Sequence, residues 1–449
     1  MLRRGDWMIS DFITLKKGSK TPLYFQIYRK ISAAIESGSL KENEKLPSVR
    51  KLCADLEVSK TTVEAAYNAL SADGYIINSP QRGYFVEKGL FVGGKSEVKK
   101  AESKKEKRTY KYDFSGKGID GDITNIKEWR KYIRDVLNRE YLLTTYSENQ
   151  GEEELRRALA NYAFTTRGII TDKDSIVVGS GSQTLIYILC GLLGLNKTVA
   201  IERDSFPQAE RVFRDFKYNI RYTDNDAQGI SVNSLREINP DIILINPNYN
   251  SAFGGKTSAK RKIEIAAYAK RSNAIIIEDD YNGELRYKTH PAPCLQSYSP
   301  ENTVYIGSFS KILLPSVRIS YMSLPDSLNK IYGRIRDTYN QTTSKTEQLA
   351  LAEYISDGKL EKHLRRSRRY YKTKSEMMKK AIIKRFPRYL FNETSMYFEI
   401  EGELSKLNGS EIRVMKTSAD NKLRLNFSGI SSTVIEEGID EISRLLSAE

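Results

Sequence analysis

The chain has 449 residues, a formal net charge of +15 and a hydrophobic fraction of 39%, enough for a packed core, which excludes a disordered chain. Its three cysteines are isolated, which excludes a disulfide framework and a cysteine-based zinc site and favours a reducing compartment. The longest apolar stretch, residues 184–195, is too short to cross a bilayer, and the N-terminus lacks a signal-peptide core. We therefore expect a soluble cytoplasmic protein.

The positive charge has two interpretations that composition alone leaves open. Clustered Lys and Arg side chains gain affinity for a phosphate backbone by releasing counterions, which would make nucleic acid the partner. Alternatively, the excess lysine only solvates the surface. The position of the charges relative to sequence motifs has to decide between these two interpretations.

Residues 15–87 have the pattern of short helices followed by a strand hairpin. Pro47 and Ser48 open a helix with apolar residues at helical spacing, and the turn "VSKTT" leads to a second helix that Ser59 caps. The stretch "GYIINSPQRGYFV" predicts two strands around a turn, with Arg82 at its tip. The residues of the second helix that we expect to face inward are Val63, Ala66, Tyr67 and Leu70.

These motifs resemble the GntR-type DNA-binding domain, a winged helix-turn-helix. The shared features are a Pro-Ser-x-Arg start of the first helix, the "VSKTTV" turn and the "GYFV" end of the wing. In such a domain the exposed start of the second helix reaches base edges and phosphates. The resemblance implies that double-stranded DNA is a partner. The DNA contacts that it implies are Arg50, Lys60, Thr61, Thr62 and Arg82.

The rest of the chain divides into a polar segment and a long α/β pattern. Residues 88–111 are rich in Gly and Lys with almost no apolar periodicity, which predicts a flexible basic linker. From residue 112 onward, the β-branched runs "SIVVGS", "TVAIE", "DIILINP", "AIIIEDD" and "TVYIGS" alternate with amphipathic segments. Near-continuous apolar strands separated by helices predict an α/β domain over residues 112–449 with a mostly parallel central sheet.

A single lysine, Lys311, follows the run "TVYIGS", and the hydroxyls of Ser308 and Ser310 precede it. An amine at a buried strand end suits pyridoxal phosphate, which needs an amine for an imine, an anion-binding turn, a carboxylate for its ring nitrogen and an aromatic face. The serine-nucleophile motif S-x-x-K also fits residues 308–311, but its partner motifs S-D-N and K-T-G do not occur in the chain.

The other requirements of that cofactor also have candidates at the ends of predicted strands. Amides at the start of a helix can bind its phosphate. The candidates for that role are Gly181, Ser182 and Gln183. Asp279 and Asp280 are candidate carboxylates for the ring nitrogen, and the sequence leaves open which of them faces the ring. Phe206 is a candidate stacking face, and Asn250 is a candidate polar contact.

In this order, the segments resemble fold-type I aminotransferases over about residues 112–445, and the whole chain resembles the MocR/GabR subfamily of GntR regulators. In that subfamily an aminotransferase-like domain serves as an effector sensor. The resemblance implies that Lys311 forms an imine with pyridoxal 5'-phosphate and that Asp279 pairs with the pyridine nitrogen. Further implied contacts are Tyr281 and Asn250 to the phenolate oxygen, Ser308, Ser310 and Arg318 to the phosphate, and Arg424 to an effector carboxylate.

The resemblance therefore predicts a regulator that senses an amino compound through aldimine chemistry at Lys311 and changes its DNA binding in response. Pyridoxal phosphate itself is an alternative ligand. The other class of function is an active aminotransferase with an accessory DNA-binding domain, but a metabolic enzyme gains nothing from binding DNA. Fold-type I sites borrow residues across a dimer interface, so we expect a homodimer, in a head-to-tail arrangement, with Tyr146 reaching the neighbouring subunit's phosphate.

Overall fold

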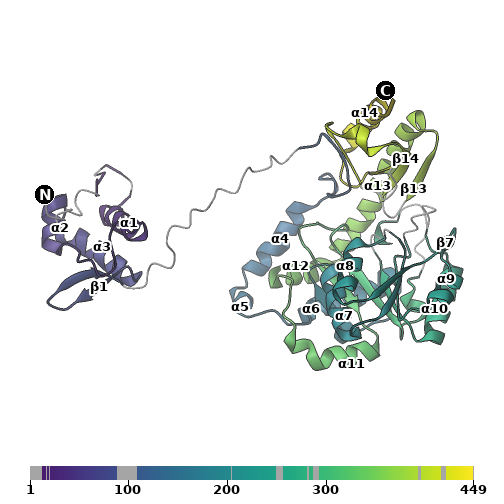
Figure 1. Ribbon diagram of the computed structural model, residues 1–449, viewed down its shortest axis with the longest axis horizontal. Helices are drawn as coiled ribbons and strands as arrows, with labels where there is room; N and C mark the ends of the chain where they lie inside the picture. The colour runs from purple at the N-terminus through teal and green to yellow at the C-terminus, as the bar shows by residue number, and fades with distance from the viewer. Residues whose placement is uncertain are drawn as a thin grey trace. The chain divides into compact units, whose positions relative to one another are not determined.

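The computed structural model divides into two compact units, Met1–Lys107 and Arg108–Glu449 (Figure 1). The residues that it describes are 13–16, 18–19, 21–87, 109–203, 205–248, 256–280, 283–286, 293–392, 396–415 and 421–447. Most of the expected linker, residues 88–108, lies outside these ranges. None of the helices in the described ranges has both the length and the apolar character needed to cross a bilayer.

The N-terminal unit is a three-helix domain with a two-stranded wing, as predicted. Its elements are α1 (Leu23–Glu36), α2 (Val49–Leu56), α3 (Lys60–Ala72), β1 (Ile76–Ser79) and β2 (Gly83–Val86). Ser48 and Ser59 cap α2 and α3, because their hydroxyls accept hydrogen bonds from the amides of Lys51 and Thr62. The buried residues of α3 are the four predicted ones, Val63, Ala66, Tyr67 and Leu70.

The second unit is built on a seven-stranded sheet with the order β4-β12-β11-β10-β9-β5-β6. Only β12 runs antiparallel to its neighbours, so the expectation of a mostly parallel sheet is confirmed. The strands are β4 (Ile176–Gly179), β5 (Thr198–Ile201), β6 (Asn219–Tyr222), β9 (Ile242–Ile245), β10 (Ile275–Asp279), β11 (Thr303–Ser308) and β12 (Ser320–Ser323).

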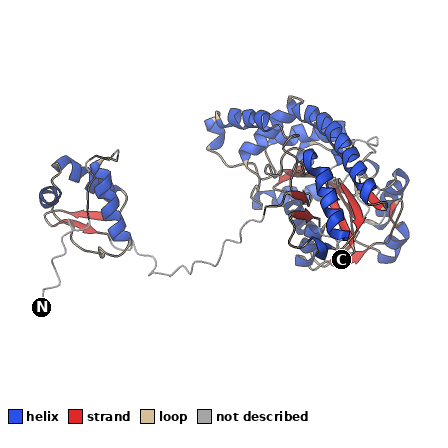
Figure 2. Cartoon of the chain, turned by 90° about the horizontal axis from the view of Figure 1, so that it is seen from above, coloured by secondary structure: helices blue, strands red, loops and turns tan. Residues whose placement is uncertain are grey.

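Helices cover both faces of this sheet (Figure 2). One apolar cluster joins the sheet to α7, α8 and α11, and two others join its opposite face to α6 and α12 and to α9 and α10. The helices are α4 (Ile126–Leu137), α5 (Glu140–Leu143), α6 (Glu153–Arg167), α7 (Ser182–Leu193), α8 (Pro207–Asp215), α9 (Val232–Ile238), α10 (Ala259–Ser272), α11 (Asp326–Ile335) and α12 (Lys345–Ser356). A small hairpin joins β7 (Asn225–Asp226) and β8 (Gly229–Ile230).

A smaller layer follows the long helix α13 (Lys359–Arg385) and contains the C-terminal helix α14 (Ile435–Ser447) (Figure 1). Its antiparallel sheet has the order β13-β14-β16, and a separate parallel pair joins β15 to β3, the first strand of the unit. The strands are β3 (Tyr112–Phe114), β13 (Tyr389–Asn392), β14 (Tyr397–Glu401), β15 (Ile412–Val414) and β16 (Lys422–Asn426). The start and the end of the unit are thus tied together.

Candidate functional site

Lys311 lies just beyond the carboxyl end of β11, where its amine is held by one loop and by one hydroxyl. Its Nζ donates hydrogen bonds to the carbonyl of Gly116, to the carbonyl of Gly118 at 3.2 Å and to Ser428 Oγ at 3.4 Å. Burial lowers the pKa of Lys311 to about 8. A larger fraction of this amine is therefore neutral and nucleophilic near pH 7.5 than of an ordinary lysine.

A cradle for an anion lies at the start of α7, where three of the predicted residues meet. Gly181 is the N-cap residue with φ +140°, and no side chain caps the helix. The guanidinium of Arg318 covers this glycine, because a Cβ on Gly181 would lie 2.7 Å from Arg318 Nη2. Arg318 Nη1 also donates to Ser310 Oγ at 3.3 Å. An uncapped helix N-terminus and a guanidinium are both positive, so an anion would stabilise their approach.

The remaining predicted phosphate residues adjoin this cradle. Ser308 Oγ accepts hydrogen bonds from the Ser310 amide at 3.4 Å and from Ser320 Oγ at 3.0 Å. Ser182 and Gln183 form the first turn of α7. The structure therefore brings the predicted glycine, the two serines and the arginine together from two separate stretches of the chain.

The two adjacent aspartates have different environments, because successive residues of a strand point to opposite faces of the sheet. Asp279 lies on the face of Ile277, is 9% exposed, and has no side-chain hydrogen bond or ion pair with the described residues. Burial and the neighbouring charge of Asp280 raise the pKa of Asp279 to about 7. This carboxyl is available to a ligand.

Asp280, on the opposite face, is committed to a buried network. It accepts hydrogen bonds from Arg167 Nε at 2.5 Å, from Tyr305 OH at 2.9 Å and from Asn248 Nδ2. Although burial opposes ionisation, the Arg167 guanidinium lowers the pKa of Asp280 to about 2. The geometry thus separates the two carboxylates that the sequence left equivalent, and it favours Asp279 as the partner of a ring nitrogen.

Three other predicted residues have different outcomes. Asn250 and Tyr281 lie outside the described residues. Phe206 is the N-cap residue of α8 and is half-buried against the apolar cluster beneath that helix. Its packing is compatible with a stacking face but does not require that role.

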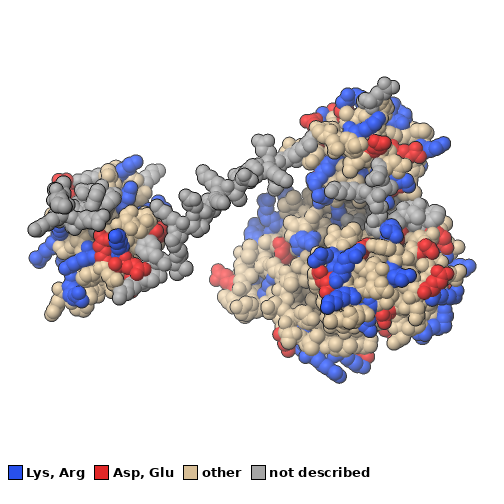
Figure 3. Space-filling model, viewed as in Figure 1, with Lys and Arg blue, Asp and Glu red and all other residues tan. Residues whose placement is uncertain are grey.

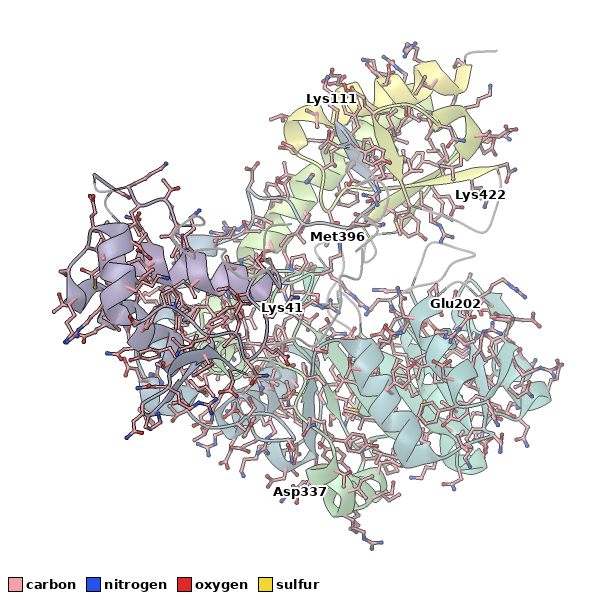
Figure 4. All side chains as sticks on the ribbon, turned by 60° about the vertical axis from the view of Figure 1, so that its left-hand side comes forward. Lys41, Lys111, Glu202, Asp337, Met396 and Lys422 are labelled. Atoms are coloured by element: carbon pink, nitrogen blue, oxygen red, sulfur yellow. The ribbon has the colours of Figure 1, made fainter. Side chains whose placement is uncertain are left out.

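Arg424, the candidate carboxylate-binding residue, pairs with a carboxylate of its own sheet. Its Nε donates to Glu399 Oε2 at 2.7 Å, and Lys422 Nζ (labelled in Figure 4) donates to Glu399 Oε1 at 2.9 Å. Burial would raise the pKa of Glu399, but the two cations hold it below its ordinary value. An effector carboxylate would therefore have to share Arg424 with Glu399.

The sequence interpretation missed several residues of this site. Gly116, Gly118 and Ser428 hold the Lys311 amine, and Arg167 and Asn248 hold Asp280. One signal was accessible: Ser428 stands in the same "NFSG" stretch that follows Arg424. Asn248 was also accessible, because it directly follows the predicted strand run "DIILINP" and lies two residues before Asn250. Gly116, Gly118 and Arg167 lie far away in sequence from the residues that they contact, so no local pattern marks them.

In the N-terminal unit, the predicted DNA contacts lie largely on the surface. Arg50, Lys60, Thr61 and Arg82 are exposed, whereas Thr62 is half-buried. Ser59 Oγ shares hydrogen bonds with the hydroxyls of Thr61 and Thr62, at 2.9 and 2.7 Å, which fixes the start of α3. The visible face of the unit carries acidic as well as basic side chains (Figure 3). On this face, therefore, the unit is not uniformly basic.

Two family descriptions match the chain. "Bacterial regulatory proteins, gntR family" matches residues 23–86, and "Aminotransferase class I and II" matches residues 117–442. Among solved structures, the kynurenine aminotransferase of Pyrococcus horikoshii has a TM-score of 0.67 at 21% identity and covers 79% of this chain and 96% of its own. At this level of identity the likeness concerns the fold alone.

Relatives that share both parts are named as regulators. The HTH-type transcriptional regulator YdeL of Bacillus subtilis is 30% identical over 94% of this chain and 96% of its own length. The pyridoxine biosynthesis transcriptional regulator PdxR of Corynebacterium glutamicum is 25% identical over 84% and 82%, and the probable rhizopine catabolism regulatory protein MocR of Rhizobium meliloti is 25% identical over 80% and 77%. The chain therefore belongs to the MocR/GabR subfamily of GntR-type transcriptional regulators, which join a winged helix-turn-helix to an aminotransferase-like domain of fold type I.

Proposed function

We propose that this regulator binds pyridoxal phosphate at Lys311 and changes its affinity for an operator DNA when an amino compound engages the same site. The observation that carries the proposal is a half-buried lysine with a lowered pKa at a sheet end that also carries a buried carboxyl, which has no side-chain hydrogen bond to the residues that the structure describes. The GntR-type unit supplies the DNA-binding part.

The residues of the site fit this cofactor in charge and shape. The space over Gly181, bordered by the Arg318 guanidinium and the start of α7, suits a phosphate. The buried Asp279 suits a protonated ring nitrogen. When bound, the cofactor supplies an aldehyde that condenses with amines, with loss of water, and a ring that withdraws electrons.

The chain's own groups would act in three ways. Lys311 would reach its neutral, nucleophilic form more readily than an ordinary lysine, because burial favours the uncharged form. Asp279 would release its proton when a cation arrives beside it, because an opposite charge stabilises the carboxylate. Arg424 would orient an effector carboxylate with the geometry that suits a planar guanidinium.

The alternative function is an active aminotransferase, which the fold of the second unit also allows. We favour a sensor because the chain carries a DNA-binding unit and its relatives are named as regulators. The two functions differ in turnover. Sustained transfer between an amino donor and a keto acid at ordinary aminotransferase rates, about 1–1000 per second, would contradict the sensor proposal.

Pyridoxal phosphate itself is a second candidate signal, because the PdxR relative is named as a regulator of pyridoxine biosynthesis. DNA affinity would be compared for the cofactor-free protein, the loaded protein, and the loaded protein with each amino acid in turn. A change on loading alone favours the cofactor as signal. A change only after an amine is added favours an amino compound, with a coupling of about 1–3 kcal/mol.

The decisive test of the cofactor site is Lys311→Ala. The native protein should gain a visible absorbance band on addition of pyridoxal phosphate, and the variant should stay colourless because it lacks the amine. Its far-ultraviolet circular dichroism should remain native. An unchanged visible band in the variant would show that another amine holds the cofactor.

We also propose a homodimer in which each site is completed by its neighbour. The segment that includes α5 exposes large apolar side chains that a second copy would cover: Tyr141 is 71% exposed, Leu143 41% and Tyr146 101%. Light scattering should give the mass of two chains at micromolar concentration. A monomer at that concentration would contradict the proposal.

A further inference from the structure

The amine of Lys311 is held by one short loop, residues 115–120, which joins β3 to the turn before α4. Two of its backbone carbonyls, those of Gly116 and Gly118, accept from the amine. The loop packs tightly on β16, because a Cβ on Gly116 would lie 2.6 Å from Asn426 Cγ. Gly116 also has φ +68°, a conformation that favours glycine.

The far end of this loop is fastened to α13 through a buried ion pair. Asp120 Oδ2 accepts hydrogen bonds from Lys374 Nζ and Tyr370 OH, both at 2.5 Å. Lys374 is 1% exposed and Asp120 is 4% exposed. The Asp120 amide also donates to the carbonyl of Ser428 at 2.9 Å, beside the hydroxyl that accepts from Lys311. Neither member of the ion pair touches Lys311 itself.

We propose that Asp120 and Lys374 are positioning residues for Lys311, because their ion pair fixes the 115–120 loop where its carbonyls can hold the free amine. This inference rests on the proposed role of Lys311. Removing one partner of a buried ion pair leaves an uncompensated buried charge and is strongly destabilising, whereas the loss of one hydrogen bond to a carbonyl costs much less. The Asp120–Lys374 ion pair therefore remains intact when the Lys311 amine no longer donates to the loop carbonyls.

The contact between the amine and the loop depends on the chemical state of Lys311. A free lysine ammonium has three N–H donors, enough for both carbonyls and the Ser428 hydroxyl. An amine engaged by an aldehyde has at most one N–H left. The loop thus loses its partner when Lys311 is engaged, while Asp120 stays on α13.

The loop also lies close to the start of the second unit. It continues directly from β3, and Lys111, just before that strand, pairs with Glu437 of α14 at 2.7 Å (Lys111 is labelled in Figure 4). Residues 88–108, which join the two units, precede it. A change in the loop thus occurs close in sequence to the segment that leads to the DNA-binding unit.

The test compares three variants of the full-length, cofactor-free protein. Lys374→Met removes the anchoring cation, and Lys374→Arg keeps it. Arg261→Met is the control, because Arg261 on α10 is also a buried cation paired with a carboxylate, that of Asp226, but bonds to no residue of the loop. Two readouts are measured: hydrogen–deuterium exchange of the 116–121 amides, and the pH midpoint at which Lys311 reacts with pyridoxal phosphate, followed by absorbance.

In Lys374→Met the loop amides should exchange about tenfold faster or more, because the loop is no longer held on α13 and opens to solvent more often. The reaction midpoint should rise toward that of an ordinary lysine, since burial lowers the pKa of Lys311 and a loosened loop admits water. Lys374→Arg should restore both values toward native, and Arg261→Met should change neither.

Native exchange and a native midpoint in Lys374→Met would overturn the proposal, as would equal changes in Arg261→Met. If Lys374→Met does not fold, Tyr370→Phe decides, because it removes one hydrogen bond to Asp120 and keeps the ion pair. It should shift both readouts in the same direction by less. A native protein that never takes up the cofactor would overturn the proposed function, whereas the exchange measurement would still test the anchor.

Discussion

Both the backbone conformation at Gly181 and the guanidinium beside it require glycine at this position. Its φ of +140° with ψ of 162° is a region that costs a side-chain-bearing residue about 1–3 kcal/mol, and an added Cβ would lie 2.7 Å from Arg318 Nη2. Gly181→Ala should therefore displace the guanidinium and weaken pyridoxal phosphate binding by about tenfold or more. The measurement is titration of the visible absorbance.

Gly333 provides the control for that substitution. It lies inside α11, has no atom within 4 Å of an added Cβ, and has no positive φ. Gly333→Ala should raise the free energy of unfolding by about 0.5–1 kcal/mol and leave cofactor binding unchanged. Equal losses of binding in the two variants would refute the assigned role of Gly181.

Asp279 gives the cofactor-free protein a specific pH dependence. Its pKa in the folded protein is about 7, above its value of 3.8 in an unfolded chain, so the folded state binds the proton more tightly. The stability that this proton provides is present below pH 4 and is lost as the pH rises from about 4 to 7. Asp279→Asn should remove this loss and stabilise the cofactor-free protein at pH 8, by about 1–4 kcal/mol.

The same substitution should weaken cofactor binding, because a neutral amide lacks the negative charge that stabilises a protonated ring nitrogen. The measurements are chemical denaturation between pH 4 and 8 and an absorbance titration at pH 8. A variant with the native pH dependence of stability would mean that Asp279 does not titrate as its burial requires. Native cofactor affinity in the variant would favour Asp280, rather than Asp279, as the partner of the ring nitrogen.

At the scale of elements, the start of α3 and the neighbouring α2 carry the proposed DNA contacts. Arg50 is exposed on α2, so Arg50→Ala removes a charge without opening the core. We expect operator binding to weaken by about 1–3 kcal/mol, and the slope of log affinity against log salt to fall by about one if the contact is a phosphate. Fluorescence anisotropy with labelled operator measures both.

Arg334→Ala is the control, because it removes an equally exposed arginine from α11 of the other unit. It should leave operator affinity and salt slope close to native. The visible band of the cofactor should be the same in both variants. A changed band in Arg50→Ala would mean that the two units do not act separately at that position.

The apolar strands were the elements most readily predicted from sequence. The runs that contain β4, β5, β9, β10 and β11 were each recognised, because a strand covered on both faces requires a continuous apolar run. The caps of α2 and α3 could also be predicted from the sequence, since a serine at a helix start accepts a hydrogen bond from an amide only two or three residues away. For the same reason the lysine, the aspartates and the glycine turn at strand ends could be selected as site candidates.

The pairings that give those candidates their properties could not be predicted. Asp120 meets Lys374, and Lys311 meets Gly116, across long separations in sequence that only the tertiary structure closes. Glu399 lies opposite Arg424 because β14 and β16 pair in one register. The residue type of a candidate side chain therefore does not predict whether another residue of the chain already neutralises its charge.

At the scale of the whole molecule, the two units of the chain have different physical requirements. The first presents a capped helix and a wing on a small core, and the second buries reactive groups that need low dielectric. The capped helix and wing of the first unit form without contributions from the second, and the buried groups of the second unit obtain their pKa shifts within that unit alone. The chain between them and the assembly of two copies are two routes by which a change in one unit can reach the other.

The assembly can be tested by complementation between two defective chains. If Tyr146 of one copy completes the site of the other, Tyr146→Ala alone should weaken cofactor binding, and Lys311→Ala alone should abolish the visible band. A mixed dimer of the two variants combines an intact lysine with an intact tyrosine at one of its sites. Random mixing of equal amounts after partial denaturation should therefore restore about one site in four to native affinity.

The measurement is an absorbance titration of the refolded mixture, compared with each variant refolded alone. No restored high-affinity fraction in a mixture that light scattering identifies as dimeric would show that Tyr146 does not serve the neighbouring site. Full native affinity of Tyr146→Ala alone would show the same. The fully exposed ring of Tyr146 makes a folding defect an inadequate explanation of either result, since the ring contributes no packing within one chain.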